Sequence, residues 1–140
     1  MIVSASYKTD IPAHYGRWFL NRLAAGYCRG VNPWGGQVYT VDLRPAAVDG
    51  VVFWTRNARP FADGFAAVAA MERPFVVQYT ITGLPRALEP HVLETAAAVA
   101  DARALAARYG PRAVVWRYDP VVITDLTPPD WHRARFAELA

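Results

Sequence analysis

Short apolar segments that suit buried strands alternate with segments of helical period, and this alternation most constrains the fold. The clearest strand is residues 50–55, G-V-V-F-W-T, and similar runs occupy residues 2–6, 75–82 and 113–118. Each is followed by apolar side chains at three- or four-residue spacing, which predicts a helix. The first of these helices is expected to end at Gly26, the third to span residues 91–109, and the last to start with a capping box in T-P-P-D, residues 127–130. Repeated strand–helix order favours a parallel sheet with right-handed crossovers.

We therefore expect an α/β fold of about four parallel βα units with the helices packed outside. The sheet could be an open, doubly wound one or part of a (β/α) barrel. A complete eight-stranded barrel needs ~250 residues, so the 140 residues of this chain would make a half or partial TIM-type barrel. Residues 1–140 are expected to form a single domain, because the length suffices for only one ordinary core.

An insert is predicted between the first helix and the second strand of the sheet. Residues 27–31 and 37–43 favour β-structure and flank the turn-rich segment N-P-W-G-G. Such a pattern is typical of a β-hairpin, here spanning about residues 27–43.

Composition limits the cellular location and the binding partners that can be expected. Apolar residues make up 54% and charged residues 19%, and no apolar run approaches the ~18 residues of a membrane span. We expect a cytoplasmic protein without membrane contact. The single cysteine, Cys28, and three histidines without ligand spacing predict no metal site in this chain. The net charge is +3, but the arginines are scattered, so nucleic acid is not an expected partner.

Polar side chains recur where the predicted strands end. In a parallel sheet these ends share one rim, where ligands of α/β proteins commonly bind. A small polar or anionic ligand is the partner that such a rim would suit, and Trp54 could flank it. The candidate binding residues are Ser4, Ser6, Lys8, Thr9, Trp54, Asn57, Gln78 and Thr80, and the candidate catalytic residues are Asp10, Arg117 and Asp119.

Two readings stay open for the candidate catalytic residues. Asp10 precedes a helix that starts near Pro12, so it could cap that helix, take part in function, or do both. Arg117 alternates with Val115 on a strand that reads as buried, where an unpaired charge is costly. Asp119 points to the same face, and the two residues could form a structural pair or a clamp for an anion.

Three segments together resemble a known family. They are I-V-S-A-S-Y-K-T-D-I-P-A-H-Y, V-V-F-W-T-R-N and V-V-W-R-Y-D-P-V-V-I-T, in this order along the chain. The chain resembles bacterial proteins of unknown function that begin with an S-A-S-R-R-T-D-I-P-A-type motif. The resemblance implies a (β/α) barrel similar to radical S-adenosylmethionine (SAM) enzymes and spore photoproduct lyase. In longer family members it also implies an iron–sulfur cluster and S-adenosylmethionine.

The chain departs from this family pattern in two places. Tyr7 and Lys8 stand where the motif has paired arginines, and lysine cannot make a bidentate guanidinium contact. The cysteines that would ligate a cluster are not in this chain, so no cofactor is expected in it and enzyme activity is left open.

Two functional hypotheses follow from these features. The first is the N-terminal half of a radical-SAM-like enzyme, with Arg117 holding an anion and Asp119 orienting it. The second is a non-catalytic interaction module, or a truncated product, that completes its sheet by homodimerisation or by docking a partner such as the missing C-terminal half.

Overall fold

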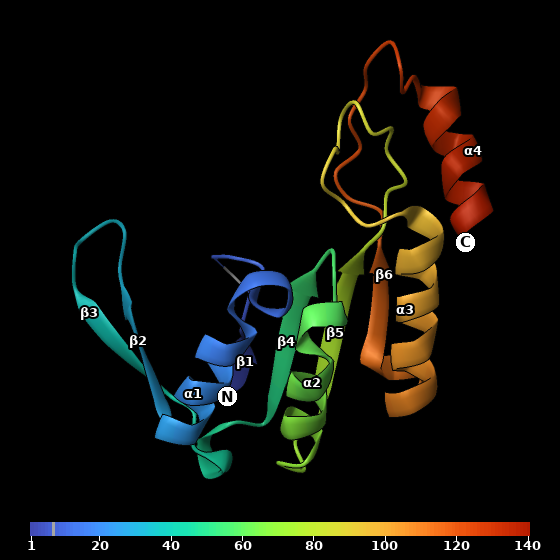
Figure 1. Ribbon diagram of the computed structural model, residues 1–140. Coiled ribbons are helices and arrows are strands. Elements are labelled where there is room, and N and C mark those ends of the chain that lie inside the picture. The colour runs from blue at the N-terminus through green and yellow to red at the C-terminus, as the bar shows by residue number, and fades with distance from the viewer. Residues whose placement is uncertain (7) are drawn as a thin grey trace.

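The computed structural model describes residues 1–6 and 8–140 and contains the expected parallel sheet. Four strands lie in the order β1-β4-β5-β6, and each neighbouring pair is parallel. The sheet is open: among the described residues, the edge strands β1 and β6 each pair with a single neighbour (Figure 1). Tyr7, expected beside Val3 and Ala5 on one face of the first strand, lies outside the described residues.

The strands and helices fall close to their predicted positions. The strands of the sheet are β1 (Ile2–Ser4), β4 (Gly50–Thr55), β5 (Phe75–Thr80) and β6 (Val114–Arg117). The helices are η1 (Ile11–Tyr15), α1 (Gly16–Ala25), η2 (Pro45–Ala47), η3 (Arg59–Phe61), α2 (Ala62–Ala69), α3 (Thr95–Tyr109), η4 (Pro111–Ala113) and α4 (Pro129–Leu139).

The predicted hairpin is present as a separate two-stranded sheet. Its strands are β2 (Tyr27–Val31) and β3 (Val38–Asp42), which pair antiparallel. Figure 1 shows the hairpin extending beside α1, away from the parallel sheet. Its base is closed by the amide of Leu43, which donates to the carbonyl of Gly26 at 2.9 Å.

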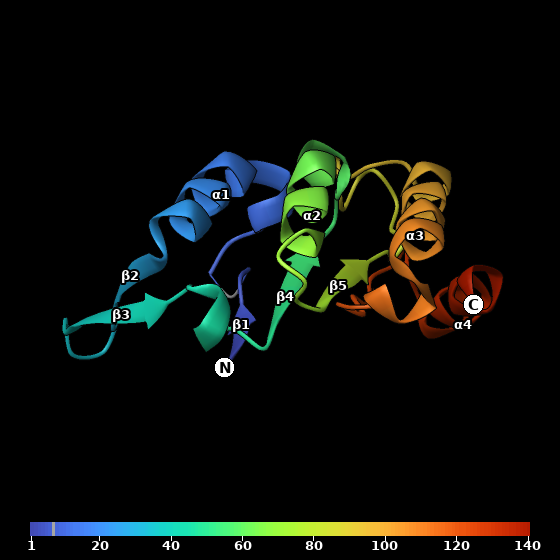
Figure 2. The ribbon, with the colours of Figure 1, turned by 90° about the horizontal axis from the view of Figure 1, so that it is seen from below.

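The core lies between the sheet and one layer of helices. Figure 2 shows α1, α2 and α3 side by side over one face, with α4 beyond α3 at the end of the sheet. Alternating side chains of β4 and β5 point into this layer, as the strand period requires. An aromatic cluster fills it, with ring centroids 5.0–6.2 Å apart for the contacting pairs among Phe19, Phe53, Phe61, Phe65 and Phe75.

No described helix covers the opposite face of the sheet (Figure 2). The side chains that alternate with the core residues point to this face, so Trp54 and Val115 are 38% and 42% exposed. Ile2, at the β1 edge, is 73% exposed. The same face carries Gln78, in register with Trp54, and Thr80, in register with Arg117.

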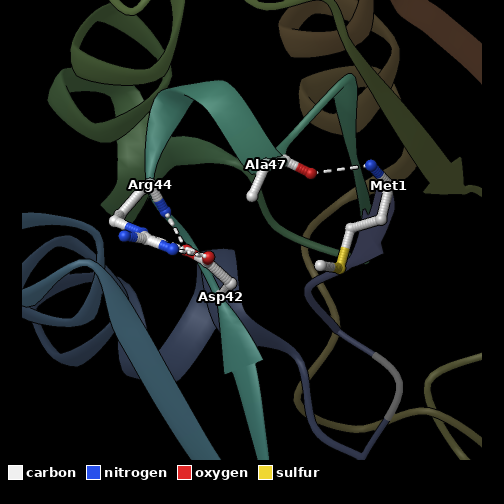
Figure 3. Close-up of polar contacts among 4 residues, drawn as sticks. All are labelled: Met1, Asp42, Arg44 and Ala47. Carbon is white, nitrogen blue, oxygen red and sulfur yellow. Dashed lines mark hydrogen bonds and ion pairs between the residues drawn. The ribbon is translucent and has the colours of Figure 1, made fainter.

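Polar contacts fix the connection from the hairpin to β4. Figure 3 shows the Met1 ammonium group donating to the Ala47 carbonyl at 2.7 Å, which joins η2 to the start of β1. In the same view, Arg44 Nε donates to Asp42 Oδ1 at 3.0 Å. These arginine contacts lower the pKa of Asp42 to about 2.

Two predicted helix starts are wrong in detail. Residues 91–94 are not helical, and Arg86 Nη1 donates to the carbonyls of Pro90 and Val92, which stabilises the non-helical path of this segment. A capping box at Thr127 was also expected, but α4 has no side-chain cap. The Thr127 hydroxyl donates instead to the Val122 carbonyl at 2.6 Å.

Candidate functional site

The carboxylate of Asp10 fastens the end of β4 to the segment that follows β1. Asp10 Oδ1 accepts from the amide of Ala13 at 2.9 Å and so caps η1. Its Oδ2 accepts from Thr55 Oγ1 and from the amide of Arg56, both at 3.0 Å. Three donors thus converge on one carboxylate, which fixes the geometry of this part of the rim.

A second polar cluster joins the loops that follow β4, β5 and β6. The guanidinium of Arg56 forms an ion pair with Glu89, whose side chain is only 15% exposed. Glu89 Oε2 also accepts from Thr82 Oγ1 at 3.0 Å. Arg56 Nη2 lies 3.4 Å from the carbonyl oxygen of Asp119, so it connects these loops to the end of β6.

Sequence reasoning did not assign a role to Glu89. It lies in a loop bracketed by prolines, 33 residues from Arg56, and local spacing carries no signal for such a pair. The only available sign was that Arg56 directly follows the last residue of a buried strand.

Arg117, at the end of β6, belongs to the part of the rim on the uncovered face of the sheet. Its guanidinium carbon lies 4.4 Å from the ring centroid of Trp54, so the side chain reaches over β5 toward β4 on the uncovered face. Asp119 forms an ion pair with Arg117 Nη2. Within the described part of the chain this guanidinium donates that one hydrogen bond, although a guanidinium carries five N–H donors.

The other candidate residues divide between the rim and a different place. Gln78 and Thr80 lie in β5, between Trp54 and Arg117. Asn57 Oδ1 accepts from the amide of Arg59 at 3.2 Å and so stabilises the turn after β4. Ser6 is 8% exposed, and its Oγ has no hydrogen-bond partner among the described residues.

Ser4, Lys8 and Thr9 do not face Arg117. They line a cavity of about 390 Å³ between β1, α1 and the hairpin. Lys8 Nζ donates to the carbonyl of Val31 at 3.1 Å, which directs this side chain toward β2. The predicted single rim site therefore separates into a rim centred on Arg117 and a cavity beside β1.

A tyrosine–histidine pair supports the loop after β6. The hydroxyl of Tyr118 lies 2.8 Å from His132 Nδ1, and His132 Nε2 lies 2.9 Å from the carbonyl oxygen of Val122. A carbonyl only accepts, so Nε2 carries the proton and Nδ1 accepts from the tyrosine. Burial raises the pKa of Tyr118, which keeps this hydroxyl available as a donor.

The described residues do not form a metal centre. Among residues 1–6 and 8–140, no three histidine, cysteine or acidic side chains are placed to hold an ion together. Cys28 lies in β2, on the wall of the cavity rather than on the rim. In the same part of the chain, no helix has both the length and the apolar character needed to cross a membrane.

Comparison with known proteins identifies a family. The family described as a domain of unknown function (DUF1848) matches residues 2–140. No curated protein and no solved structure matches the chain.

Proposed function

The chain belongs to the DUF1848 family, a domain of unknown function, and we propose that its strand-end rim binds a small anionic ligand through Arg117. The observation that carries this proposal is the guanidinium of Arg117 lying over the Trp54 ring with most of its donors unused. The cation–π contact holds the guanidinium in place and leaves N–H donors free for a carboxylate or phosphate.

The neighbours of Arg117 suit this role. Asp119 is 58% exposed and balances the arginine charge when no ligand is bound. An arriving anion would compete with that carboxylate for the guanidinium, because both prefer its bidentate edge. Gln78 and Thr80, on the same face, would supply neutral hydrogen bonds. Arg56, already paired with Glu89, would position the loops rather than bind the ligand.

We also propose that this rim belongs to the N-terminal half of a radical-SAM-like enzyme. Its support is the resemblance of three sequence segments to a family of unknown function, which implies a barrel similar to radical SAM enzymes, together with the parallel sheet. The residues present do not fit an iron–sulfur cluster, since cluster ligation needs several thiolates and the sequence has one cysteine, on the hairpin. The role assigned to this chain is therefore binding, and no chemical step is assigned to the cluster.

Side-chain NMR tests the rim proposal. Inorganic phosphate and succinate are titrated into the 15N-labelled chain while the Nε–H signals of Arg117 and Trp54 are followed. We expect saturable shifts of both signals, and a loss of at least about tenfold in affinity in Arg117→Ala, because a charged hydrogen-bonding partner is removed.

Arg112→Ala is the matched control, because Arg112 is an exposed arginine in η4 outside the rim. It should bind both anions as the parent chain does. Equal affinity in the parent and in Arg117→Ala, or no saturable shift in the parent, would contradict the proposal.

A second candidate function rests on the uncovered sheet face. Four parallel strands with helices on one face, two open edges and exposed apolar side chains are the features expected of half a (β/α) barrel. We propose that a second copy completes the sheet, with β1 of each copy beside β6 of the other. Such an arrangement has two-fold symmetry and keeps all eight strands parallel.

Sedimentation equilibrium tests this assembly. The parent chain should sediment at twice its mass of 15.5 kDa, and Val115→Glu should sediment as a monomer, because it places a charge on the face to be buried. Arg103→Glu, on the exposed side of α3, is the control and should stay dimeric. A soluble monomer of the parent chain at high concentration would rule out the second function.

A further inference from the structure

The cavity between β1, α1 and the hairpin is lined by apolar and by cationic residues, and we propose that it binds an amphipathic anion. The ligand class is an apolar body that ends in one carboxylate or sulfonate group. This site is separate from the Arg117 rim and does not depend on the function proposed there.

The size and lining of the cavity suit an apolar body. Its volume of about 390 Å³ falls within the range of ~300–1,000 Å³ that is typical of small-molecule sites. The apolar wall comes from β1, from α1 and from the hairpin, so a ligand would contact all three elements. Its members include Val3, Ile11, Trp18, Phe19, Val41 and Leu43.

The charged residues of the lining are all cationic. Lys8, Arg22 and Arg29 line the cavity, and no aspartate or glutamate is among the described residues that do so. None of the three forms an ion pair with a carboxylate of residues 1–6 and 8–140. Three uncompensated cations around an apolar space favour a negatively charged ligand and disfavour a cationic one.

Arg22 supplies a second, independent sign of a ligand. Its Nε is buried and has no hydrogen-bond partner among the described residues. A buried donor without a partner costs stability, more so when the group is charged, and such groups call for an explanation. Because Arg22 also lines the cavity, a carboxylate or sulfonate bound there would accept from its guanidinium.

Ser4 adds a polar residue to the same wall. Three lining residues, Tyr15, Trp18 and Tyr39, are 45–50% exposed, so the cavity opens to solvent and a ligand can enter without unfolding the chain.

Calorimetry with two probes of equal chain length tests the charge preference. Decanoate and decyltrimethylammonium, each below its micellar concentration, are titrated separately into the full chain. We expect one saturable site for decanoate and at least about tenfold weaker binding of the cation. Equal affinities would mean unspecific apolar binding and would overturn the proposal, as would no binding of decanoate.

Arg22→Gln tests the contact with the anionic group. It should weaken decanoate binding by about tenfold or more, because it replaces a charged donor by a neutral one. Arg103→Gln makes the same change on α3, outside the cavity, and should bind as the parent does. If Arg22→Gln fails to fold, as judged by circular dichroism, Lys8→Gln takes its place with the same expectation.

The single cysteine reports where the ligand binds. Cys28 lines the cavity, so saturating decanoate should slow its alkylation by iodoacetamide at least about fivefold, in proportion to the occupied fraction. Decyltrimethylammonium at the same concentration is the control and should give little protection. Decanoate binding without protection of Cys28 would place the ligand elsewhere and overturn the assignment.

Discussion

Asp10 holds together two chain segments that lie 45 residues apart, and its three hydrogen bonds account for its place in the rim. One oxygen caps η1 and the other receives the end of β4. The capping role that the sequence allowed is therefore confirmed, and the same carboxylate also positions the end of β4. A catalytic role for Asp10 stays a prediction.

Replacing Asp10 by alanine should destabilise the fold. Loss of the cap, together with unsatisfied donors on Thr55 and Arg56, should lower the free energy of unfolding by about 2 kcal/mol. Urea denaturation followed by circular dichroism measures this change. Asp125→Ala, in an exposed loop, is the control and should change stability by less than about 0.5 kcal/mol. Equal stability of the two variants would contradict the role given to Asp10.

Asp42 should show a distinct pH response. The hydrogen bonds from Arg44 lower its pKa from 3.8 to about 2. Because the folded pKa is below the unfolded one, the pair stabilises the fold above about pH 4 and this stabilisation is lost as the pH falls toward about 2.

Carbon-13 NMR titration of the Asp42 carboxyl group measures this pKa directly. In Arg44→Gln it should return to its ordinary range, and in Arg112→Gln it should not change. A depressed pKa that persists without Arg44 would show that another group is its cause.

The residue types of the rim were predictable from sequence, but their partners were only partly so. Arg117 and Asp119 are two positions apart on one strand, which local period can detect. Lys8 was expected on the rim and instead reaches the hairpin, because the path of the chain between β1 and α1 decides its direction. The ion pair between Arg56 and Glu89 depends on how two distant loops meet, and local sequence patterns do not predict such a contact.

Among the elements, α1 has the best defined end. Gly26 has φ of 76°, in the left-handed region, and its amide donates to the carbonyl of Leu23. A Cβ at this position would lie 3.2 Å from Arg44 Cγ. Gly26→Ala should therefore lower the free energy of unfolding by about 1 kcal/mol.

Gly26→Asn separates the two causes. Asparagine adopts the left-handed region more readily than alanine but brings the same Cβ. Thermal denaturation should show a smaller loss for asparagine if backbone conformation dominates. Equal losses in both variants would assign the cost to the contact with Arg44.

Element types and order followed from the sequence because strand and helix periods are local properties. β4 begins and ends where its apolar run does, and Gly26 marks the end of α1 as expected. The start of α3 was placed too early, because contacts from Arg86 stabilise a non-helical path for the residues before it. The spacing of apolar residues does not predict contacts of this kind.

At the scale of the molecule, the parallel sheet and the hairpin should differ in local stability. β4 and β5 are paired on both sides and packed against the aromatic cluster, whereas β2 and β3 pair only with each other. Native-state hydrogen exchange should show amides of β4 and β5 opening only with global unfolding and those of β2 and β3 opening locally. Equal protection of the two sheets would mean that the hairpin belongs to the same cooperative unit.

The closed base of the hairpin also has a practical consequence for engineering. The bond from Leu43 to Gly26 brings the two ends of the insert together at the foot of α1, and residues 32–37 form its distant turn. The turn can therefore serve as a graft site for foreign loops, with the sheet as an unchanged scaffold. Exchanging β2 and β3 as a cassette would reshape one wall of the cavity and so redirect its selectivity.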